Sequence, residues 1–443
     1  MTQRFWNKQP CQIISKNDAM KQIKLYAQFI ITLFLPFTLI AQTNKYLLTD
    51  NKLKTKLDSV INNAAGFYMQ DSNANGISIG VYRKGIKYTY NYGEAKKGTN
   101  ILPSADKFYN IGSVAKTFVA TILAQAAVDK KLNLNDDIRK FLPGKYPNLE
   151  YEGNPIRFIN LANHTSGLPT TFRMFSPSIR DSLKKLSIAG QVDFYSLYSE
   201  DSLLSDLHLV KPDTLPGTKF QYNSSAMTLL ILLLERVYHQ PYEKIVTNYL
   251  MTHLKMFDTK PFLSSEEIKN AVQGYDNNSK PQQFLNLKGF YFGPTMNSTI
   301  NDMLKFIQAN LSEKDKAIRL THQLTYGKKN GFGLGLGWMM DNSSNGERYF
   351  YHDGNTKIGY NTLCTLYPTE DLGFIIIVND TISQDKVGEV ENNIKKALDK
   401  KWRKAAGNKR HRLADGIAIS YKSISAIVQA RHTKVYHPSQ EMK

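Results

Sequence analysis

Segments with the pattern of β-strands occur near both ends of the chain, and the long stretch between them has the pattern of helices. The strand-like segments are residues 76–85, 86–95, 348–352, 359–368 and 371–380. The first two alternate around a turn at Lys84-Gly85, which predicts a β-hairpin. Strands at both ends with helices between them predict an α/β (α+β) fold, in which both ends of the chain supply one sheet and a helical domain is inserted.

Four helices are predicted from apolar residues at helical spacing. They cover residues 50–68, a segment that begins at Ser113, residues 226–238 and residues 386–401. In the second of them, one helix face carries Ala115, Phe118, Val119, Ile122, Leu123 and Ala126. The region from about 130 to 345 is otherwise expected to hold helices and long loops.

The formal net charge of +19 is concentrated at the two ends of the chain. Residues 1–45 carry about +5 and residues 399–443 about +8, which leaves roughly +6 spread over the long middle. So diffuse a charge does not form a stripe that follows a phosphate backbone, and we expect no nucleic-acid partner. The basic segment 399–443 is predicted to be an appended or out-of-frame tail that is disordered.

The N-terminal 42 residues have the layout of an export signal. In residues 20–42, two lysines precede an apolar run that ends at Ala41, a small residue suited to cleavage. Met20 is therefore the expected start of the product. The alternative is an uncleaved anchor, because the apolar run is near the ~17 residues needed to span a bilayer. Either way the body of the protein is predicted to be periplasmic or extracellular, with membrane contact through this segment only.

The chain has two cysteines, Cys11 and Cys364, which excludes a disulfide framework. No Cys and His residues cluster at the spacing of a zinc site.

Ser113 and Lys116 form the first candidate chemical pair. Ser113 follows Gly112 and opens a helix, whose first turn presents unpaired backbone N–H groups that can stabilise an oxyanion. Residues i and i+3 share a helix face, so the Lys116 amine can reach the Ser113 hydroxyl and, if buried, act as its base. A serine cap followed by a solvated lysine fits this stretch equally well and is the more common arrangement.

Tyr222 is the second candidate, since it follows the turn at Pro216-Gly217 and precedes an apolar helix. Nearby cations that lower its pKa would let it relay protons. A half-buried structural tyrosine is the alternative.

The third candidate stretch is His352-Asp353-Gly354, expected at the end of a strand. Gly354 would let the backbone come close to a ligand, and the Asn355 N–H could be a second oxyanion donor. An ordinary turn at the end of a strand is the alternative.

Together the three stretches resemble the serine β-lactamase-like family, which includes class C β-lactamases, penicillin-binding DD-peptidases, esterases and D-aminopeptidases. The family motif Ser-x-x-Lys matches Ser113 and Lys116. The motif Tyr-x-Asn matches at Tyr222, but Ser224 stands where the family has asparagine. The third motif, Lys or His followed by any residue and then Gly, matches His352 and Gly354. Residues 160–169, 293–306 and 331–340 also resemble the family, and the resemblance covers about residues 50–398. It implies an antiparallel sheet with flanking helices plus an all-helical domain, with the site between them and a hydrolase domain over residues 45–398.

The resemblance also implies acyl transfer through an acyl-serine, with no metal or cofactor. Ser113 would attack a carbonyl, Lys116 and Tyr222 would move its proton, and the N–H groups of Ser113 and Asn355 would hold the oxyanion. His352 would help to anchor the substrate and shape the field around Tyr222.

Two departures from the family pattern bear on the substrate. Ser224 is shorter than the family's asparagine, although the adjacent Asn223 could swing in to replace it. His352 carries less fixed positive charge than a lysine. Both favour a serine hydrolase acting on esters, peptides or amides, including D-amino-acid or cell-wall molecules. The alternatives are a DD-carboxypeptidase, a β-lactamase proper, or a catalytically silent exported binding protein of the same fold.

Overall fold

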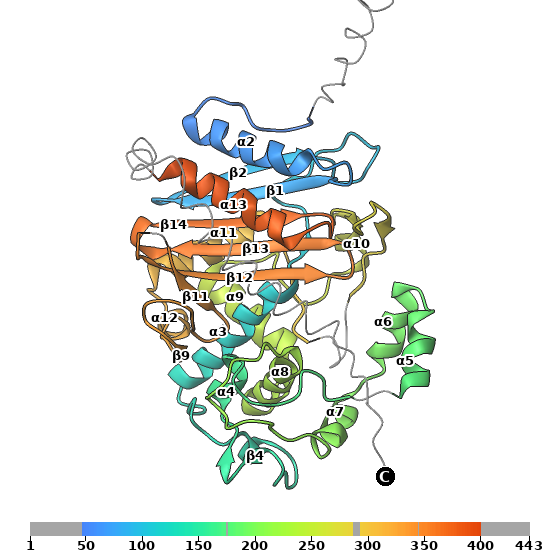
Figure 1. Ribbon diagram of the computed structural model, residues 1–443, viewed down its shortest axis with the longest axis vertical. Coiled ribbons are helices and arrows are strands. Elements are labelled where there is room, and N and C mark those ends of the chain that lie inside the picture. The colour runs from blue at the N-terminus through green and yellow to red at the C-terminus, as the bar shows by residue number, and fades with distance from the viewer. Residues whose placement is uncertain (1–46, 174–175, 287–292, 344, 400–443) are drawn as a thin grey trace, which may run out of the picture. The chain divides into compact units, whose positions relative to one another are not determined.

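An eight-stranded antiparallel sheet is the centre of the computed structural model, which describes residues 47–173, 176–286, 293–343 and 345–399 (Figure 1). Its strand order is β2-β1-β14-β13-β12-β11-β10-β9. The bounds are β1 Gly76–Arg83, β2 Ile86–Gly93, β9 Tyr326–Gly327, β10 Gly333–Leu334, β11 Met339–Asn342, β12 Arg348–Thr356, β13 Tyr360–Tyr367 and β14 Leu372–Val378. Because β1 pairs with β14, the N-terminal hairpin is joined to the C-terminal strands. The prediction of one sheet made by both ends of the chain is confirmed.

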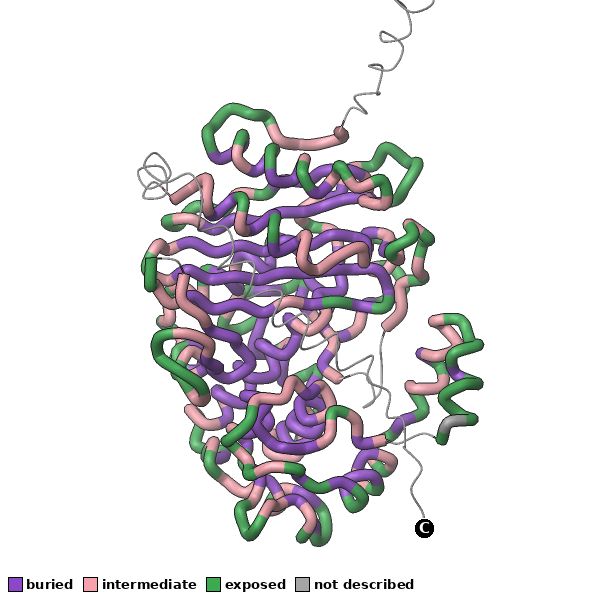
Figure 2. Tube along the Cα trace, viewed as in Figure 1, coloured by how far each residue is buried: buried purple, intermediate pink, exposed green. Residues whose placement is uncertain are grey.

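Helices cover both faces of this sheet, so its central strands are buried along their whole length. Every residue of β13 and β14 is buried, as Figure 2 shows for the middle of the sheet. On one face lie α2 (Lys56–Met69) and α13 (Gln384–Leu398), which contact each other. On the other face α11 (Ile300–Ser312) packs against β1 and β14. Runs of Ile, Val and Leu are what a strand covered on both faces requires.

The helical part of the fold is built around α3 (Ala115–Val128), most of whose residues are buried. It contacts α8, α9 and α12. The remaining helices are α4 Phe158–Ala162, α5 Pro177–Lys184, α6 Ile188–Ser196, α7 Glu200–Leu207, α8 Ser224–Tyr238, α9 Tyr242–Leu254, α10 Ser265–Lys269 and α12 Lys316–Thr321. The 3₁₀ turns are η1 Gly112–Val114, η2 Ile138–Phe141 and η3 Pro368–Glu370. Among the described residues from Leu48 to Asp399, sheet and helices pack as one compact unit.

Outside the main sheet, three two-stranded sheets, each made of two-residue strands, pair segments of the loops with one another. They are β3 Tyr109–Asn110 with β8 Asn297–Ser298, β4 Glu150–Tyr151 with β5 Asn154–Pro155, and β6 Gly274–Tyr275 with β7 Pro281–Gln282. The first pair matters for the site, because it ties the segment just before Ser113 to the segment that precedes α11.

Local structure differs from the sequence predictions at several places. The helix expected over residues 50–68 begins at Lys56, and strands β9, β10 and β11 lie in the region expected to hold helices and long loops. The α-helix expected from Ser113 begins at Ala115, because residues 112–114 form the 3₁₀ turn η1. Helix α8 begins at Ser224, two residues early, since the Asn223 side chain caps it. His352-Asp353-Gly354 lies inside β12, which continues to Thr356, and not at the end of a strand.

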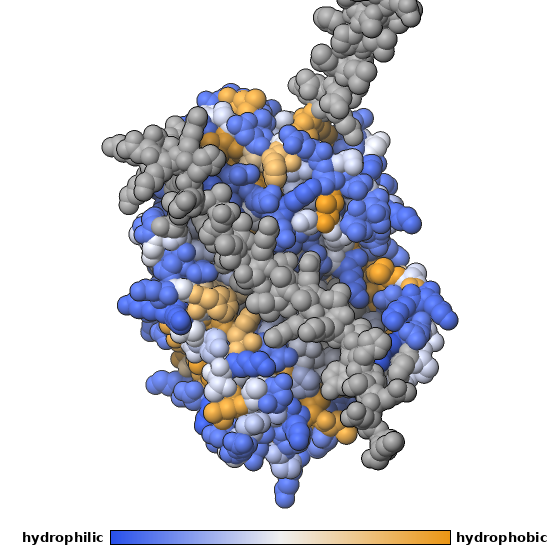
Figure 3. Space-filling view, in the orientation of Figure 1, coloured by the Kyte–Doolittle hydropathy of each residue, from blue (hydrophilic) through white to orange (hydrophobic). Residues whose placement is uncertain are grey.

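On the face shown in Figure 3, the described residues are mostly hydrophilic, with scattered apolar side chains. Within these residues, no helix combines the length and the apolar character needed to cross a bilayer. The predicted export signal and the predicted basic tail lie outside the described residues.

Candidate active site

Ser113 sits in the 3₁₀ turn η1, directly before α3. The turn is held by Asn110, whose Oδ1 accepts a hydrogen bond from the Gly112 N–H at 3.1 Å. Gly112 has a φ of +53°, a conformation in which a residue with a side chain would be strained. The Ser113 side chain makes no capping hydrogen bond with the turn or with α3, so the interpretation of Ser113 as a helix cap is wrong.

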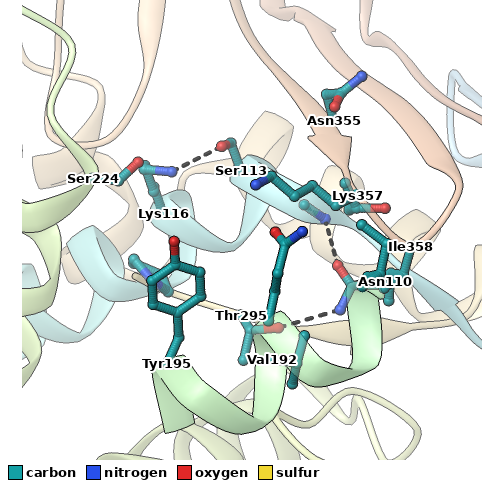
Figure 4. Close-up of a pocket in the computed structure, with 15 residues that line it drawn as sticks. Asn110, Ser113, Lys116, Val192, Tyr195, Ser224, Thr295, Asn355, Lys357 and Ile358 are labelled. Carbon is teal, nitrogen blue, oxygen red and sulfur yellow. Dashed lines mark hydrogen bonds between the residues drawn. The ribbon is translucent and has the colours of Figure 1, made fainter. Parts of the chain in front are cut away.

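Lys116 lies beside Ser113, as the i, i+3 spacing predicted. Its Nζ donates a hydrogen bond to Ser113 Oγ at 2.8 Å (Figure 4). Only 2% of Lys116 is exposed, so the alternative of a solvated lysine is wrong. Burial lowers the pKa of Lys116 from 10.5 to about 7, and Asp353 opposes this shift. A large fraction of Lys116 is therefore neutral near pH 7 and able to accept a proton.

The Tyr222 side chain lies next to the same two residues. Lys116 Nζ is 4.9 Å from the centroid of its ring, and the side chains of Ser113 and Ser224 lie close enough to the Tyr222 hydroxyl to favour its ionised form through hydrogen bonding. Burial raises the pKa of Tyr222 despite these hydrogen bonds. The expected lowering of this pKa by cations is not found, because desolvation of the phenolate is the dominant influence on it. Tyr222 thus holds its proton at neutral pH.

His352 is buried in β12 next to Tyr222, with 6.2 Å between the ring centroids. Burial and the nearby Lys116 lower its pKa to about 3. Its Nδ1 lies 2.6 Å from the backbone carbonyl oxygen of Asp353, which accepts a hydrogen bond when Nδ1 carries the proton. His352 is a neutral side chain, which agrees with the prediction that it offers less fixed charge than a lysine.

Gly354 and Asn355 of β12 lie directly against the turn that carries Ser113. A Cβ added to Gly354 would be 2.3 Å from the Ile111 carbonyl oxygen and 3.0 Å from the Ser113 nitrogen. A Cβ added to Gly112 would be 3.0 Å from the Asn355 nitrogen. The two glycines thus let the backbone at Ser113 approach the backbone at Asn355, as a pair of oxyanion donors requires.

Asn223 is not part of this group. It is buried, its Oδ1 accepts from the Ala226 N–H, and its Nδ2 donates to the carbonyl oxygens of Leu168 and Pro169, each at 2.9 Å. The expectation that Asn223 could swing into the site is wrong, because its amide is used to cap α8 and to hold a loop. Ser224, by contrast, lines the cavity in front of Ser113.

A cavity of about 360 Å³ opens in front of Ser113 and Lys116. Its walls include residues that the sequence analysis did not single out: Asn110, Ile188, Gln191, Val192, Tyr195, Pro294, Thr295, Thr356, Lys357 and Ile358. Helix α6 supplies an apolar wall with Ile188 and Val192. The Lys357 side chain extends toward Ser113 (Figure 4). Among the described residues, no group of three or more His, Cys, Asp or Glu side chains could hold a metal ion.

Comparison with known sequences gives one family and several relatives. The sequence model of the family described as Beta-lactamase matches residues 61–398. A β-lactamase of Lysobacter lactamgenus is 25% identical over 264 residues, which are 59% of this chain and 62% of that protein. A β-lactamase of Pseudomonas fluorescens is 26% identical over 295 residues, which are 65% of this chain and 75% of that protein. The chain thus spans about three fifths of the length of the first relative.

Solved structures share the fold. A protein described as β-lactamase/D-alanine carboxypeptidase from Pseudomonas syringae superposes with a TM-score of 0.64 and 21% identity. The superposition covers 78% of this chain and 100% of the other. Such similarity shows that the antiparallel sheet and the helical part are arranged as in that protein.

Proposed function

Because the chain belongs to the β-lactamase family, a family of serine hydrolases, we propose that it hydrolyses esters, small peptides or amides through an acyl-serine intermediate. The observation that carries this proposal is the 2.8 Å contact between Lys116 Nζ and Ser113 Oγ. A buried lysine with a pKa of about 7 is a base matched to neutral pH, and the nucleophile lies within hydrogen-bonding distance of it.

In the proposed acylation step, Ser113 Oγ gives its proton to neutral Lys116 and bonds to the carbonyl carbon of the substrate. The electron pair of the carbonyl π bond moves to oxygen, where the N–H groups of Ser113 and Asn355 stabilise the charge. Lys116 then passes the proton through Tyr222 to the leaving alkoxide or amine as the C–O or C–N bond breaks. A protonated Tyr222 suits this relay, because it donates one proton while receiving another.

In the proposed second step, water attacks the acyl-serine ester and the proton returns by the same route. The acid product leaves, and Ser113 recovers its hydroxyl proton. His352 contacts Tyr222 as a neutral ring, so its part is to shape the surroundings of the relay rather than to supply charge.

We propose that residues 45–398 form the hydrolase domain and that the protein is exported. The family match over residues 61–398 supports the first part. The lysines and the apolar run of residues 20–42 support the second.

Labelling with a fluorescent penicillin and with an ester probe, side by side, tests the function. Intact-mass spectrometry should place one acyl adduct on the peptide that contains Ser113, and Ser113→Ala should abolish it. Ser182→Ala is a matched control, because Ser182 in α5 and Lys185 at the C-cap of α5 have the same spacing and are both exposed. An adduct on another serine, or equal labelling of Ser113→Ala, would contradict the proposal.

A further inference from the structure

His164 holds the backbone on both sides of Tyr222. Its carbonyl oxygen accepts a hydrogen bond from the Gln221 N–H at 2.8 Å. Its side-chain Nδ1 accepts one from the Asn223 N–H at 3.2 Å. One residue therefore binds the chain immediately before and immediately after the tyrosine, although 58 positions of sequence separate His164 from Tyr222.

The His164 imidazole also packs against the Tyr222 ring, with 4.7 Å between the centroids. Lys116 Nζ contacts the same ring at 4.9 Å. Tyr222 is thus confined by His164 and Lys116 together. His164 itself is only 4% exposed and has a φ of +57°, a conformation rarely adopted by a residue with a side chain.

These contacts define the protonation state of His164. Because Nδ1 accepts the Asn223 N–H, it carries no proton, and the ring is the neutral Nε2–H tautomer. Burial and the facing side chains of Lys116 and His352 lower the pKa of His164 well below 6.5, which keeps the acceptor in place.

We infer that His164 is a positioning residue of the acyl-transfer site, which fixes the Tyr222 hydroxyl between Ser113 and Ser224. This inference rests on the proposed function, in which Tyr222 carries the proton to the leaving group. His164 does not contact the reacting atoms in this scheme. It acts through Tyr222, so its removal should affect the steps that need the relay and spare those that do not.

The choice of leaving group separates this role from a general structural one. A nitrophenolate leaves without protonation, whereas an alkoxide must be protonated as it leaves. His164→Leu should therefore lower kcat/KM, which reports acylation, by about tenfold or more for an alkyl ester and leave kcat/KM for the nitrophenyl ester of the same acid nearly unchanged. Tyr222→Phe should show the same selectivity more strongly. The double variant should lose no more activity on the alkyl ester than Tyr222→Phe alone, because both changes act on the same proton relay.

His164→Asn provides a second variant in case the His164→Leu protein does not fold. Asparagine tolerates a positive φ, and its side-chain oxygen can accept the Asn223 N–H, but it lacks the ring that packs on Tyr222. It should give a smaller loss with the same leaving-group selectivity. His239→Leu is the matched control, because His239 also has a positive φ, of +53°, but is exposed at the far end of α8.

The outcomes are distinguishable. If wild-type protein cleaves neither ester and forms no adduct at Ser113, the proposed function itself fails. If wild-type protein is active, but the His164 variants slow both esters equally or their effect multiplies with that of Tyr222→Phe, only the inference on His164 is overturned.

Discussion

The amine nitrogen of Lys116 lies 2.8 Å from the hydroxyl oxygen of Ser113, and less than one helical turn separates the two residues along the chain. Their spacing brings the two groups together, but burial gives the pair its chemistry. In water the same lysine would be protonated at pH 7 and could not accept the serine proton. Desolvation by the surrounding core lowers its pKa to about 7.

This pKa predicts how the rate of acylation depends on pH. Lys116 must be neutral to act as a base, so kcat/KM should rise as pH increases through about 7 and level off above 8. His352 should not contribute to this rise, because its pKa is about 3. Initial rates with a neutral ester from pH 5 to 9 would measure the profile. A rate independent of pH over this range would contradict the assignment of Lys116 as the base.

Replacing Lys116 by methionine should separate activity from stability. Acylation should fall by at least ~100-fold, the usual contribution of a positioned proton acceptor. The folded protein should become more stable below pH 7, because the wild type must bury a charge there. The lowered pKa means that this cost disappears only as pH rises from about 7 toward 10.5, where the unfolded chain also loses the proton. The gain is on the order of a few kcal/mol.

Thermal unfolding at pH 6 and pH 10 measures this difference. The melting temperature of Lys116→Met should exceed that of the wild type most clearly at pH 6 and approach it at pH 10. Lys185→Met serves as the control, since Lys185 belongs to the equally spaced but exposed pair. A lower melting temperature of Lys116→Met at both pH values would indicate that Lys116 stabilises the fold.

The sequence predicted five of the eight strands of the sheet, β1, β2, β12, β13 and β14, and the Ser113–Lys116 pair, because these depend on short-range periodicity. Alternation over the strands and an i, i+3 spacing can be read without knowing what packs where. The burial of Lys116 could not be read this way, since it depends on helices and strands far away in the chain. The wrong expectation for the pKa of Tyr222 has the same cause.

Residues that meet only through tertiary structure were missed or misplaced. His164 is in the stretch 160–169, which resembles the family, yet no local pattern shows that its ring reaches Tyr222. The apolar wall from α6 and the Lys357 side chain lack any spacing signal. Asn223 was misjudged because the choice between capping a helix and facing a cavity depends on how α8 enters the fold.

Gly354→Ala should inactivate the enzyme. The new Cβ would meet the Ile111 carbonyl oxygen at 2.3 Å, so the turn that carries Ser113 must move away from β12. Loss of one oxyanion donor lowers kcat by ~10²-fold or more. Gly66→Ala is the control, because a Cβ there meets nothing within 4 Å and Gly66 lies in helix α2. Initial rates and melting curves of both variants test this, and a fully active Gly354→Ala would contradict the close approach.

Ester turnover should exceed hydrolysis of a cephalosporin by a wide margin. Ser224 lacks the amide that the family's asparagine supplies, and the structure leaves Asn223 unable to replace it. A lost hydrogen bond to a substrate amide costs ~1–3 kcal/mol, so Ser224→Asn should raise β-lactam acylation relative to ester cleavage by about tenfold or more. Side-by-side kinetics of the two substrates measure this ratio. Faster hydrolysis of the cephalosporin than of the ester by the wild type would contradict the prediction that Ser224 disfavours β-lactam substrates.

Lys357 should favour substrates that carry a carboxylate near the ester. Its side chain extends toward Ser113 from the end of β12, at the edge of the cavity, whereas the buried His352 is neutral (Figure 4). Two esters that differ only in a terminal carboxylate or carboxamide isolate the effect. Lys357→Ala should raise KM for the carboxylate ester by about tenfold, equivalent to ~1.4 kcal/mol, and leave the carboxamide ester unchanged. The wild-type preference should also weaken in high salt, because an exposed cation is screened. Lys84→Ala, in the exposed turn between β1 and β2, should change neither ester. An equal effect of Lys357→Ala on both esters would mean that Lys357 shapes the cavity without recognising charge.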